Sequence, residues 1–177
     1  MKKYIVVSAV GKDRPGFVNR ITHAINELGG NIELQRSTRM ADEFALIFLF
    51  SVEAARSKEA IDHVATLKLP ETFITAREAV STDIVHPDLA GLAELTASGA
   101  DQPGIIDVVT NVLFQQNINI ESMDYDTESA PMTGEHLFRM TARLAIPRGL
   151  DVDALRQKLR DMEKEYNFDV ILRYPVE

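Results

Sequence analysis

The feature that most constrains the fold of this chain is an internal repeat. The segment Gly11-Lys12-Asp13-Arg14-Pro15-Gly16 has the pattern G-x-D-x-P-G, and the same pattern returns in Gly99-Ala100-Asp101-Gln102-Pro103-Gly104. Without a gap, residues 11–33 and 99–121 are identical at eight positions: Gly11/Gly99, Asp13/Asp101, Pro15/Pro103, Gly16/Gly104, Thr22/Thr110, Asn31/Asn119, Ile32/Ile120 and Glu33/Glu121. A repeat of this length predicts two copies of one structural unit.

In each copy the motif predicts the start of a helix. A hydrophobic run ends at its first glycine, and apolar residues at helical spacing follow its proline, a residue suited to a first helical turn. We expect Asp13 and Asp101 to accept hydrogen bonds from the first free N–H groups of that helix. Gly16 and Gly104 would let a neighbouring backbone or a ligand come close.

A helix start of this kind can also bind an anion. Its free N–H groups lie at the positive end of the helix dipole, where a carboxylate is stabilised. The simpler interpretation is that D-x-P-G only starts a helix. Two copies at matched spacing favour a ligand-binding role for at least one of them.

Hydrophobic periodicity predicts the order β-α-β-β-α-β in the first copy. Ile32 and Leu34 are expected to point inward, Gly29-Gly30 to end the first helix, and Ser57 to cap the second helix. The predicted elements are a strand at 4–10, a helix at 15–28, a strand at 31–39, a turn at 40–42, a strand through Phe44, Leu46, Phe48 and Phe50, a helix at 57–67, and a strand at 72–79.

The second copy repeats this order with a longer hairpin loop. Asp151 is expected to cap its second helix. The predicted elements are a strand at 92–98, a helix at 103–116, a strand at 118–127, a turn-rich loop at 128–134, a strand at 138–146, a helix through Val152, Leu155, Leu159 and Met162, and a strand at 168–174.

The predicted fold class is therefore α+β, with two tandem ferredoxin-like units. Each unit would place two helices on one face of a four-stranded antiparallel sheet. The expected boundaries are a first domain at 1–80, a linker at 81–90 and a second domain at 91–177. Units this small bury little surface, so we expect their sheet edges or helix faces to pack together, within the chain or in a homodimer.

Composition narrows the class of protein. The absence of cysteine excludes disulfides and thiolate metal sites, and the net charge of −8 with a pI near 5.0 argues against direct binding to nucleic acid. We find no signal-peptide pattern and no apolar stretch long enough to cross a membrane, so we expect a cytoplasmic protein.

No catalytic motif is present, and we expect no catalytic residue, no metal and no cofactor. The four histidines stand apart in the sequence, and the acidic set at Glu121, Asp124, Asp126 and Glu128 lacks the spacing of a cation-binding loop. These acidic side chains are more typical of a solvated strand face.

The G-x-D-x-P-G motif after a strand, a helix of about four turns, and Asn-Ile opening the next strand together resemble the ACT domain, a small regulatory module that binds amino acids. Both halves match. Two such units alone, and the opening segment at 5–16, are most similar to the group of glycine cleavage system transcriptional repressors. The resemblance implies a cytoplasmic regulator that acts on an activator protein rather than on DNA.

The resemblance also implies a binding site. In serine-sensing ACT domains, a polar residue at the place of Asp13 and an asparagine at the place of Asn31 contact the amino acid across a domain interface. The sensors have asparagine where this chain has aspartate, so the aspartate either faces an ammonium group or only caps its helix. The implied ligand residues are Gly11, Asp13, Pro15, Gly16, Asn19, Asn31 and Ile32 in the first unit, and Gly99, Asp101, Pro103, Gly104, Asp107, Asn119 and Ile120 in the second.

Two functions are compatible with the sequence, and two others lack the residues that they would need. The favoured one is a non-enzymatic regulator that senses a small amino acid, with glycine or serine as candidates, and controls transcription through a protein partner. The second is a tandem protein-interaction module or regulatory subunit of a metabolic enzyme. An enzyme would need a nucleophile–base or metal constellation, which is missing. An RNA-binding protein of this strand order would need stacking aromatics and a basic surface, and the chain has no tryptophan and is acidic.

Overall fold

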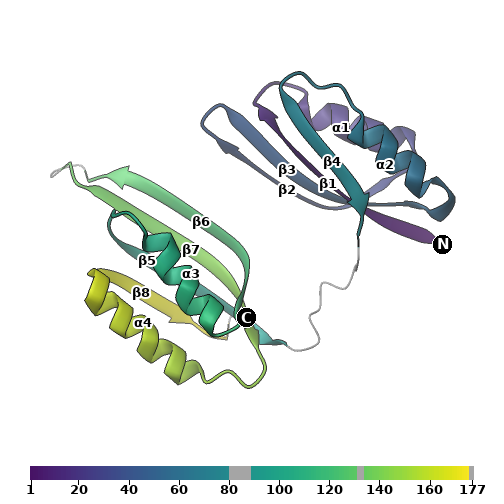
Figure 1. Ribbon diagram of the computed structural model, residues 1–177. Helices are drawn as coiled ribbons and strands as arrows, with labels where there is room; N and C mark the ends of the chain where they lie inside the picture. The colour runs from purple at the N-terminus through teal and green to yellow at the C-terminus, as the bar shows by residue number, and fades with distance from the viewer. Residues whose placement is uncertain (80–88, 131–133, 176–177) are drawn as a thin grey trace. The chain divides into compact units, whose positions relative to one another are not determined.

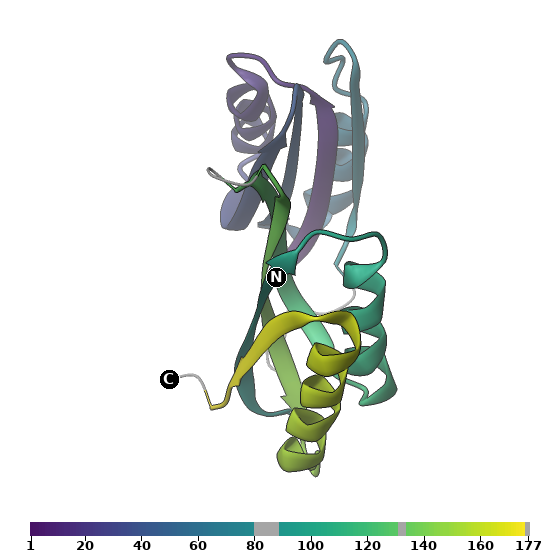
Figure 2. The same cartoon turned by 90° about the vertical axis from the view of Figure 1, so that its left-hand side faces the viewer.

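The computed structural model describes residues 1–79, 89–130 and 134–175, which form two compact units, each with its own sheet and helices (Figure 1). In both units the two helices lie on one face of a four-stranded sheet whose paired strands are all antiparallel (Figures 1 and 2). The predicted α+β class and the tandem ferredoxin-like plan are confirmed.

The first unit has the strand order β2-β3-β1-β4. Its central strands β1 and β3 pair along their whole length, from Lys2 opposite Glu53 to Lys12 opposite Glu43. The elements are β1 (Lys2–Lys12), α1 (Phe17–Glu27), β2 (Asn31–Met40), β3 (Glu43–Glu53), the 3₁₀ turn η1 (Ala54–Arg56), α2 (Ser57–Ala65) and β4 (Thr72–Glu78).

The second unit has the matching order β6-β7-β5-β8. Strand β7 follows β6 after a longer connection than the one between β2 and β3, as the turn-rich loop predicted. The elements are β5 (Leu89–Ala100), α3 (Ile105–Gln115), β6 (Asn119–Ser129), β7 (His136–Pro147), α4 (Val152–Tyr166) and β8 (Phe168–Arg173).

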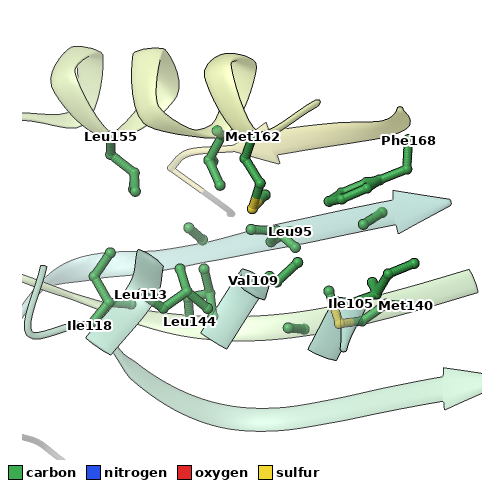
Figure 3. Close-up of a cluster of buried hydrophobic side chains, with 14 of the residues drawn as sticks. Leu95, Ile105, Val109, Leu113, Ile118, Met140, Leu144, Leu155, Met162 and Phe168 are labelled. Atoms are coloured by element: carbon green, nitrogen blue, oxygen red, sulfur yellow. The ribbon is translucent and has the colours of Figure 1, made fainter. Parts of the chain in front are cut away.

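Alternation along the central strands builds both cores. Ile5, Val7 and Ala9 of β1 are fully buried beneath the helices, and Phe48 and Phe50 of β3 complete the same layer. In the second core, Leu155 and Met162 of α4 and Ile105, Val109 and Leu113 of α3 pack in one layer between the helices and the sheet, together with Leu95 of β5 (Figure 3).

The helix ends follow the predicted capping at one site and depart from it at another. Asp151 caps α4, because its Oδ1 accepts hydrogen bonds from the N–H groups of Asp153 and Ala154, each at 3.0 Å. The prediction that Ser57 caps α2 is wrong: Arg56 holds the cap position and no side chain bonds the free N–H groups. The turn η1 leads directly into α2 and makes Ser57 its first residue.

The prediction that Ile32 and Leu34 point inward is also wrong. Their strand, β2, is exposed along its entire length. Ile32 is 36% exposed and Leu34 is 42% exposed, so neither points into the core. The strand lies at the edge of the sheet, and a bulge between these two residues interrupts the alternation that would have pointed both inward.

Part of the predicted linker belongs to the second sheet, since β5 begins at Leu89. Residues 81–88 lie outside the described residues, so the domain boundaries near residues 80 and 91 stay a prediction. In the predicted loop at 128–134, β6 continues to Ser129 and residues 131–133 lie outside the described residues.

Candidate functional site

The two loops with the G-x-D-x-P-G pattern connect the first strand of each unit to its first helix. Each loop begins with a backbone hydrogen bond to the neighbouring hairpin: the Asp13 N–H donates to the carbonyl oxygen of Asp42 at 2.8 Å, and the Asp101 N–H donates to that of His136 at 2.7 Å. The two copies therefore hold their loops in the same way.

The last glycine of each motif, rather than the aspartate, occupies the cap position of the helix. Gly16 has φ 86° and Gly104 has φ 93°, a left-handed conformation that glycine adopts without strain. A Cβ on either glycine would meet no atom within 4 Å, so conformation rather than crowding requires glycine here. No side chain caps either helix start.

The prediction that Asp13 and Asp101 cap these helices is therefore wrong. A capping side chain must stand directly before the first helical residue, and the left-handed glycine takes that place. The Oδ2 atom of Asp13 instead lies 3.2 Å from the Nε of Arg39 on β2, and the Oδ1 of Asp101 accepts a hydrogen bond of 2.6 Å from the hydroxyl of Tyr125 on β6.

Tyr125 belongs to the wall of the second loop. Its ring stacks on Phe138, with the centroids 5.7 Å apart and the planes at 11°. Partial burial, and after it the hydrogen bond to the Asp101 carboxylate, raise the pKa of Tyr125 to about 12. The phenol therefore stays a neutral hydrogen-bond donor at physiological pH.

The first glycine of each motif has a packing role. A Cβ on Gly11 would collide with the backbone of Glu71, and one on Gly99 would lie 2.7 Å from the Cβ of Phe168. Both positions let the last strand of the unit approach the first strand closely. Gly11 and Gly99 shape the loops indirectly, through the strands on which the loops are built.

The asparagines that open β2 and β6 have equivalent partners. The Nδ2 of Asn31 donates to Glu33 at 3.1 Å, and the Nδ2 of Asn119 donates to Glu121 at 3.2 Å. The buried Ser51 also donates to Glu33, and hydrogen bonds from Ser51 and then Asn31 lower the pKa of this carboxyl. Both asparagine side chains are exposed and thus accessible to a ligand.

The first unit divides its predicted ligand residues between two hollows. Asn19, Asn31 and Ile32 line one of about 480 Å³ beside α1. Pro15 and Gly16 line a smaller one of about 80 Å³. Gly11 and Asp13 line neither of them.

The second unit gathers four predicted residues around one hollow of about 590 Å³. Its lining includes Asp101, Pro103, Gly104 and Asp107, and Tyr125 forms part of the wall. Asn119 and Ile120 are not part of this lining.

Three residues that the sequence analysis passed over line these hollows. Arg14 and Arg20 flank the small hollow of the first unit, and Tyr125 flanks the hollow of the second. The sequence did contain a signal for Arg14. The variable position before the proline of the motif is Arg14 in one copy and Gln102 in the other, so the two loops differ in charge there. No pattern pointed to Tyr125, because its contact with Asp101 depends on the pairing of β6 beside the loop.

The described residues can also be considered for metal binding and for membrane insertion. Within residues 1–79, 89–130 and 134–175, no group of three or more histidine or carboxylate side chains is placed to hold a metal ion. The acidic side chains at Glu121, Asp124, Asp126 and Glu128 are exposed on β6, as expected for a solvated strand face. No helix in these same ranges is long and apolar enough to span a membrane.

Two ferredoxin-like units in tandem, each with an uncapped helix start after its first strand, define the class of protein by its architecture. Residues 3–69 match the family model of the ACT domain, so the first unit belongs to the ACT-domain family, and the second unit repeats the fold of the first.

Known relatives extend over most of the chain. It is 26% identical over 164 residues to the glycine cleavage system transcriptional repressor of Escherichia coli K12, covering 93% of this chain and 86% of that protein. A crystal structure of an unknown protein from Galdieria sulphuraria is 33% identical, with a TM-score of 0.87 and coverage of 99% of this chain and 100% of the other.

A crystal structure of a candidate glycine cleavage system transcriptional repressor has the same fold. Its TM-score is 0.70 at 19% identity, over 98% of this chain and 97% of the other. The chain is thus a tandem ACT-domain protein of the regulatory type, related to the glycine cleavage system repressor.

Proposed function

We propose that this protein is a non-enzymatic, cytoplasmic regulator of amino-acid metabolism. It senses a small amino acid, with glycine and serine as the leading candidates, at one or both G-x-D-x-P-G loops. It acts as a homodimer and controls transcription through a protein partner, a transcriptional activator, rather than by binding DNA.

The observation that carries this proposal is the uncapped helix start in both units. Gly16 and Gly104 hold the cap positions without a capping side chain, which leaves first-turn N–H groups of α1 and α3 available to a ligand carboxylate; in α1 the N–H of Phe17 is excepted, because it donates to the carbonyl oxygen of Arg14 at 3.3 Å. Asn31 or Asn119 supplies an orienting hydrogen bond when a second domain or copy brings the asparagine to the ligand. That arrangement would account for the separation of Asn31 from the Gly16 loop within one unit.

Two properties support a protein partner in transcription. The relative that is 26% identical over 93% of this chain is named a transcriptional repressor. The net charge of −8 opposes direct contact with the phosphates of DNA. A repressor with this charge acts more readily on another protein.

A thermal-shift screen of the twenty amino acids on the full chain tests the sensing. A ligand that binds only the native state stabilises it by ~2.7 kcal/mol at a hundredfold excess over its dissociation constant. We expect glycine or serine to raise the melting temperature, and no response to any amino acid would refute the sensor function.

Calorimetry on variants then locates the site. Losing a hydrogen bond to a charged group costs roughly 1.5–3 kcal/mol, so Asn31→Ala or Asn119→Ala is expected to weaken amino-acid binding about tenfold or more. If the aspartate faces the ammonium group of the ligand, Asp13→Ala or Asp101→Ala should weaken amino-acid binding. If it only fixes the loop, the affinity should stay unchanged. Asn111→Ala, an exposed asparagine on α3, is the matched control.

The transcriptional role is tested in cells and on DNA. Deleting the gene should raise transcripts of the glycine cleavage enzymes, and Asn31→Ala or Asn119→Ala should blunt the response to added glycine. Purified protein alone should not retard the promoter DNA. Unchanged transcripts in the deletion strain would refute transcriptional control.

A further inference from the structure

The charge of the wall differs between the two candidate hollows. Arg14 and Arg20 line the hollow beside Gly16, and none of its lining residues is acidic. Asp101 and Asp107 line the hollow beside Gly104, and none of its lining residues is a lysine or arginine. Two copies of one loop therefore present opposite charges to a ligand.

The contrast arises from side chains on equivalent backbones. The cap glycines have nearly the same φ and ψ in both units. From the motif to the first turn of the helix, four changes at matched repeat positions move the second copy toward negative charge: Lys12/Ala100, Arg14/Gln102, Asn19/Asp107 and Arg20/Val108.

Arg14 and Gln102 share one structural role. The Nη2 of Arg14 donates to the carbonyl oxygen of Pro70, two residues before β4, and the Nε2 of Gln102 donates at 2.7 Å to that of Tyr166, two residues before β8. A neutral amide thus serves to anchor the loop to the approach of the last strand. The positive charge of Arg14 is additional to this role.

The guanidinium of Arg14 also has unused hydrogen-bonding capacity. Its Nε is buried and has no hydrogen-bond partner among the described residues. A buried donor without an acceptor is unfavourable, and a guanidinium pairs most strongly with a planar carboxylate. A carboxylate in the hollow of the first unit would neutralise this charge next to the N–H groups of α1.

The second loop presents the opposite chemistry. Asp107 lies in the first turn of α3, where its carboxylate interacts with the helix dipole that would otherwise attract an anion. Asp101 stands at the same hollow and accepts the Tyr125 hydrogen bond. Two carboxylates repel a ligand carboxylate and attract an ammonium group.

We propose that the two loops select ligand groups of opposite charge. The first unit takes a carboxylate group through Arg14, supported by Arg20, and the second unit takes an ammonium group through Asp101 and Asp107. This inference rests on the proposed amino-acid sensing, and it gives each loop a different charged group of the ligand to recognise.

Nuclear magnetic resonance of the full chain tests it, with the amide signals of Gly16 and Gly104 as reporters of the two loops. The probes are glycine, N-acetylglycine, which keeps only the carboxylate charge, and glycinamide, which keeps only the ammonium charge. N-acetylglycine is expected to shift the Gly16 signal and leave that of Gly104 unchanged, and glycinamide is expected to do the reverse.

Variants separate charge from structure. Arg14→Gln introduces the residue that the second copy already uses for the same anchoring bond, so the loop keeps its shape, and the affinity for N-acetylglycine is expected to fall about tenfold. Asp107→Asn should weaken glycinamide binding at Gly104 by a similar factor. Arg36→Gln removes an exposed arginine of β2 that lines neither the Gly16 hollow nor the Gly104 hollow, and it should change neither response.

The outcomes distinguish this inference from the sensing function. If glycine binds but both loops respond alike to the two probes, or Arg14→Gln binds N-acetylglycine as the wild type does, the charge selection is refuted and the sensor stands. If N-acetylglycine binds at Gly16 in an Arg14-dependent manner while no amino acid binds, the charge selection at that loop holds and the sensor fails. If no probe shifts either signal, both are refuted.

Discussion

The hydroxyl of Tyr125 donates a hydrogen bond of 2.6 Å to the carboxylate of Asp101, which joins β6 to the loop before α3. The equivalent aspartate of the first unit, Asp13, lies instead 3.2 Å from the Nε of Arg39 on β2. One motif position thus has a phenol as its partner in one copy and a guanidinium in the other. In both copies the aspartate ties the loop to the edge strand beside it.

Replacing Tyr125 with phenylalanine removes this link without emptying the stacked position against Phe138. We expect Tyr125→Phe to lower the free energy of unfolding of the second unit by about 1 kcal/mol, the usual net value of a hydrogen bond. Urea unfolding followed by signals of the second unit measures the change. Tyr166→Phe is the control, since this partly buried tyrosine of the same unit has a hydroxyl without a hydrogen-bond partner among the described residues; an equal loss in both variants would contradict the assignment.

The same contact predicts a dependence of stability on alkaline pH. The pKa of Tyr125 rises from an ordinary value of 10.0 to about 12 on folding, so the neutral phenol stabilises the fold. This contribution is complete below pH 10 and is lost as the pH rises through about 12. The stability difference between wild type and Tyr125→Phe should therefore shrink across that interval. Ultraviolet titration of the tyrosinates should also lose its highest-pH component in the variant.

Substitutions at the two glycines of the second motif, Gly99 and Gly104, should lower the free energy of unfolding for two different reasons. Gly104→Ala places a Cβ in open space but forces a left-handed backbone at φ 93°, at a cost of about 1 kcal/mol. Gly104→Asn should cost less, because asparagine tolerates this conformation. Gly99→Ala should cost about 1–3 kcal/mol, because its Cβ would lie 2.7 Å from the Cβ of Phe168. Thermal unfolding of the three variants gives the order, and equal losses for Gly104→Ala and Gly104→Asn would exclude backbone strain.

The aspartates at the helix starts should differ in their effect on stability. Asp151→Ala removes two hydrogen bonds to the first turn of α4 and is expected to cost about 1 kcal/mol. Asp13→Ala removes an ion pair whose side chains are 37% and 66% exposed, which typically contributes a few tenths of a kcal/mol. Denaturant unfolding compares the two variants. A larger loss for Asp13→Ala would indicate that this residue caps α1 after all.

Several features of the fold could be predicted from local patterns. The alternation of Phe44, Leu46, Phe48 and Phe50 in β3 and the cap at Asp151 depend only on residues near one another in the chain, and both are found as expected. A prediction that depended on neighbours across the sheet was wrong. Ile32 and Leu34 have the composition of a half-buried strand but lie at an exposed, bulged edge.

The candidate site shows the same division. The sequence located both loops, since the D-x-P-G spacing lies wholly within them. The role of Asp13 and Asp101 could not be derived, because the capping rule assumes that the aspartate adjoins the helix. The left-handed Gly16 and Gly104 displace it, and its partner comes from an edge strand that only the sheet brings near.

The sequence by itself thus determined that the protein is a tandem of two α+β units with matching loops, because a repeat and its hydrophobic periods are properties of the chain read in order. The tertiary structure alone decided which side chains face each loop. Arg14 reaches Pro70, Gln102 reaches Tyr166 and Asp101 meets Tyr125. These contacts join residues far apart in the chain, so they depend on strand order and register, which no local pattern encodes.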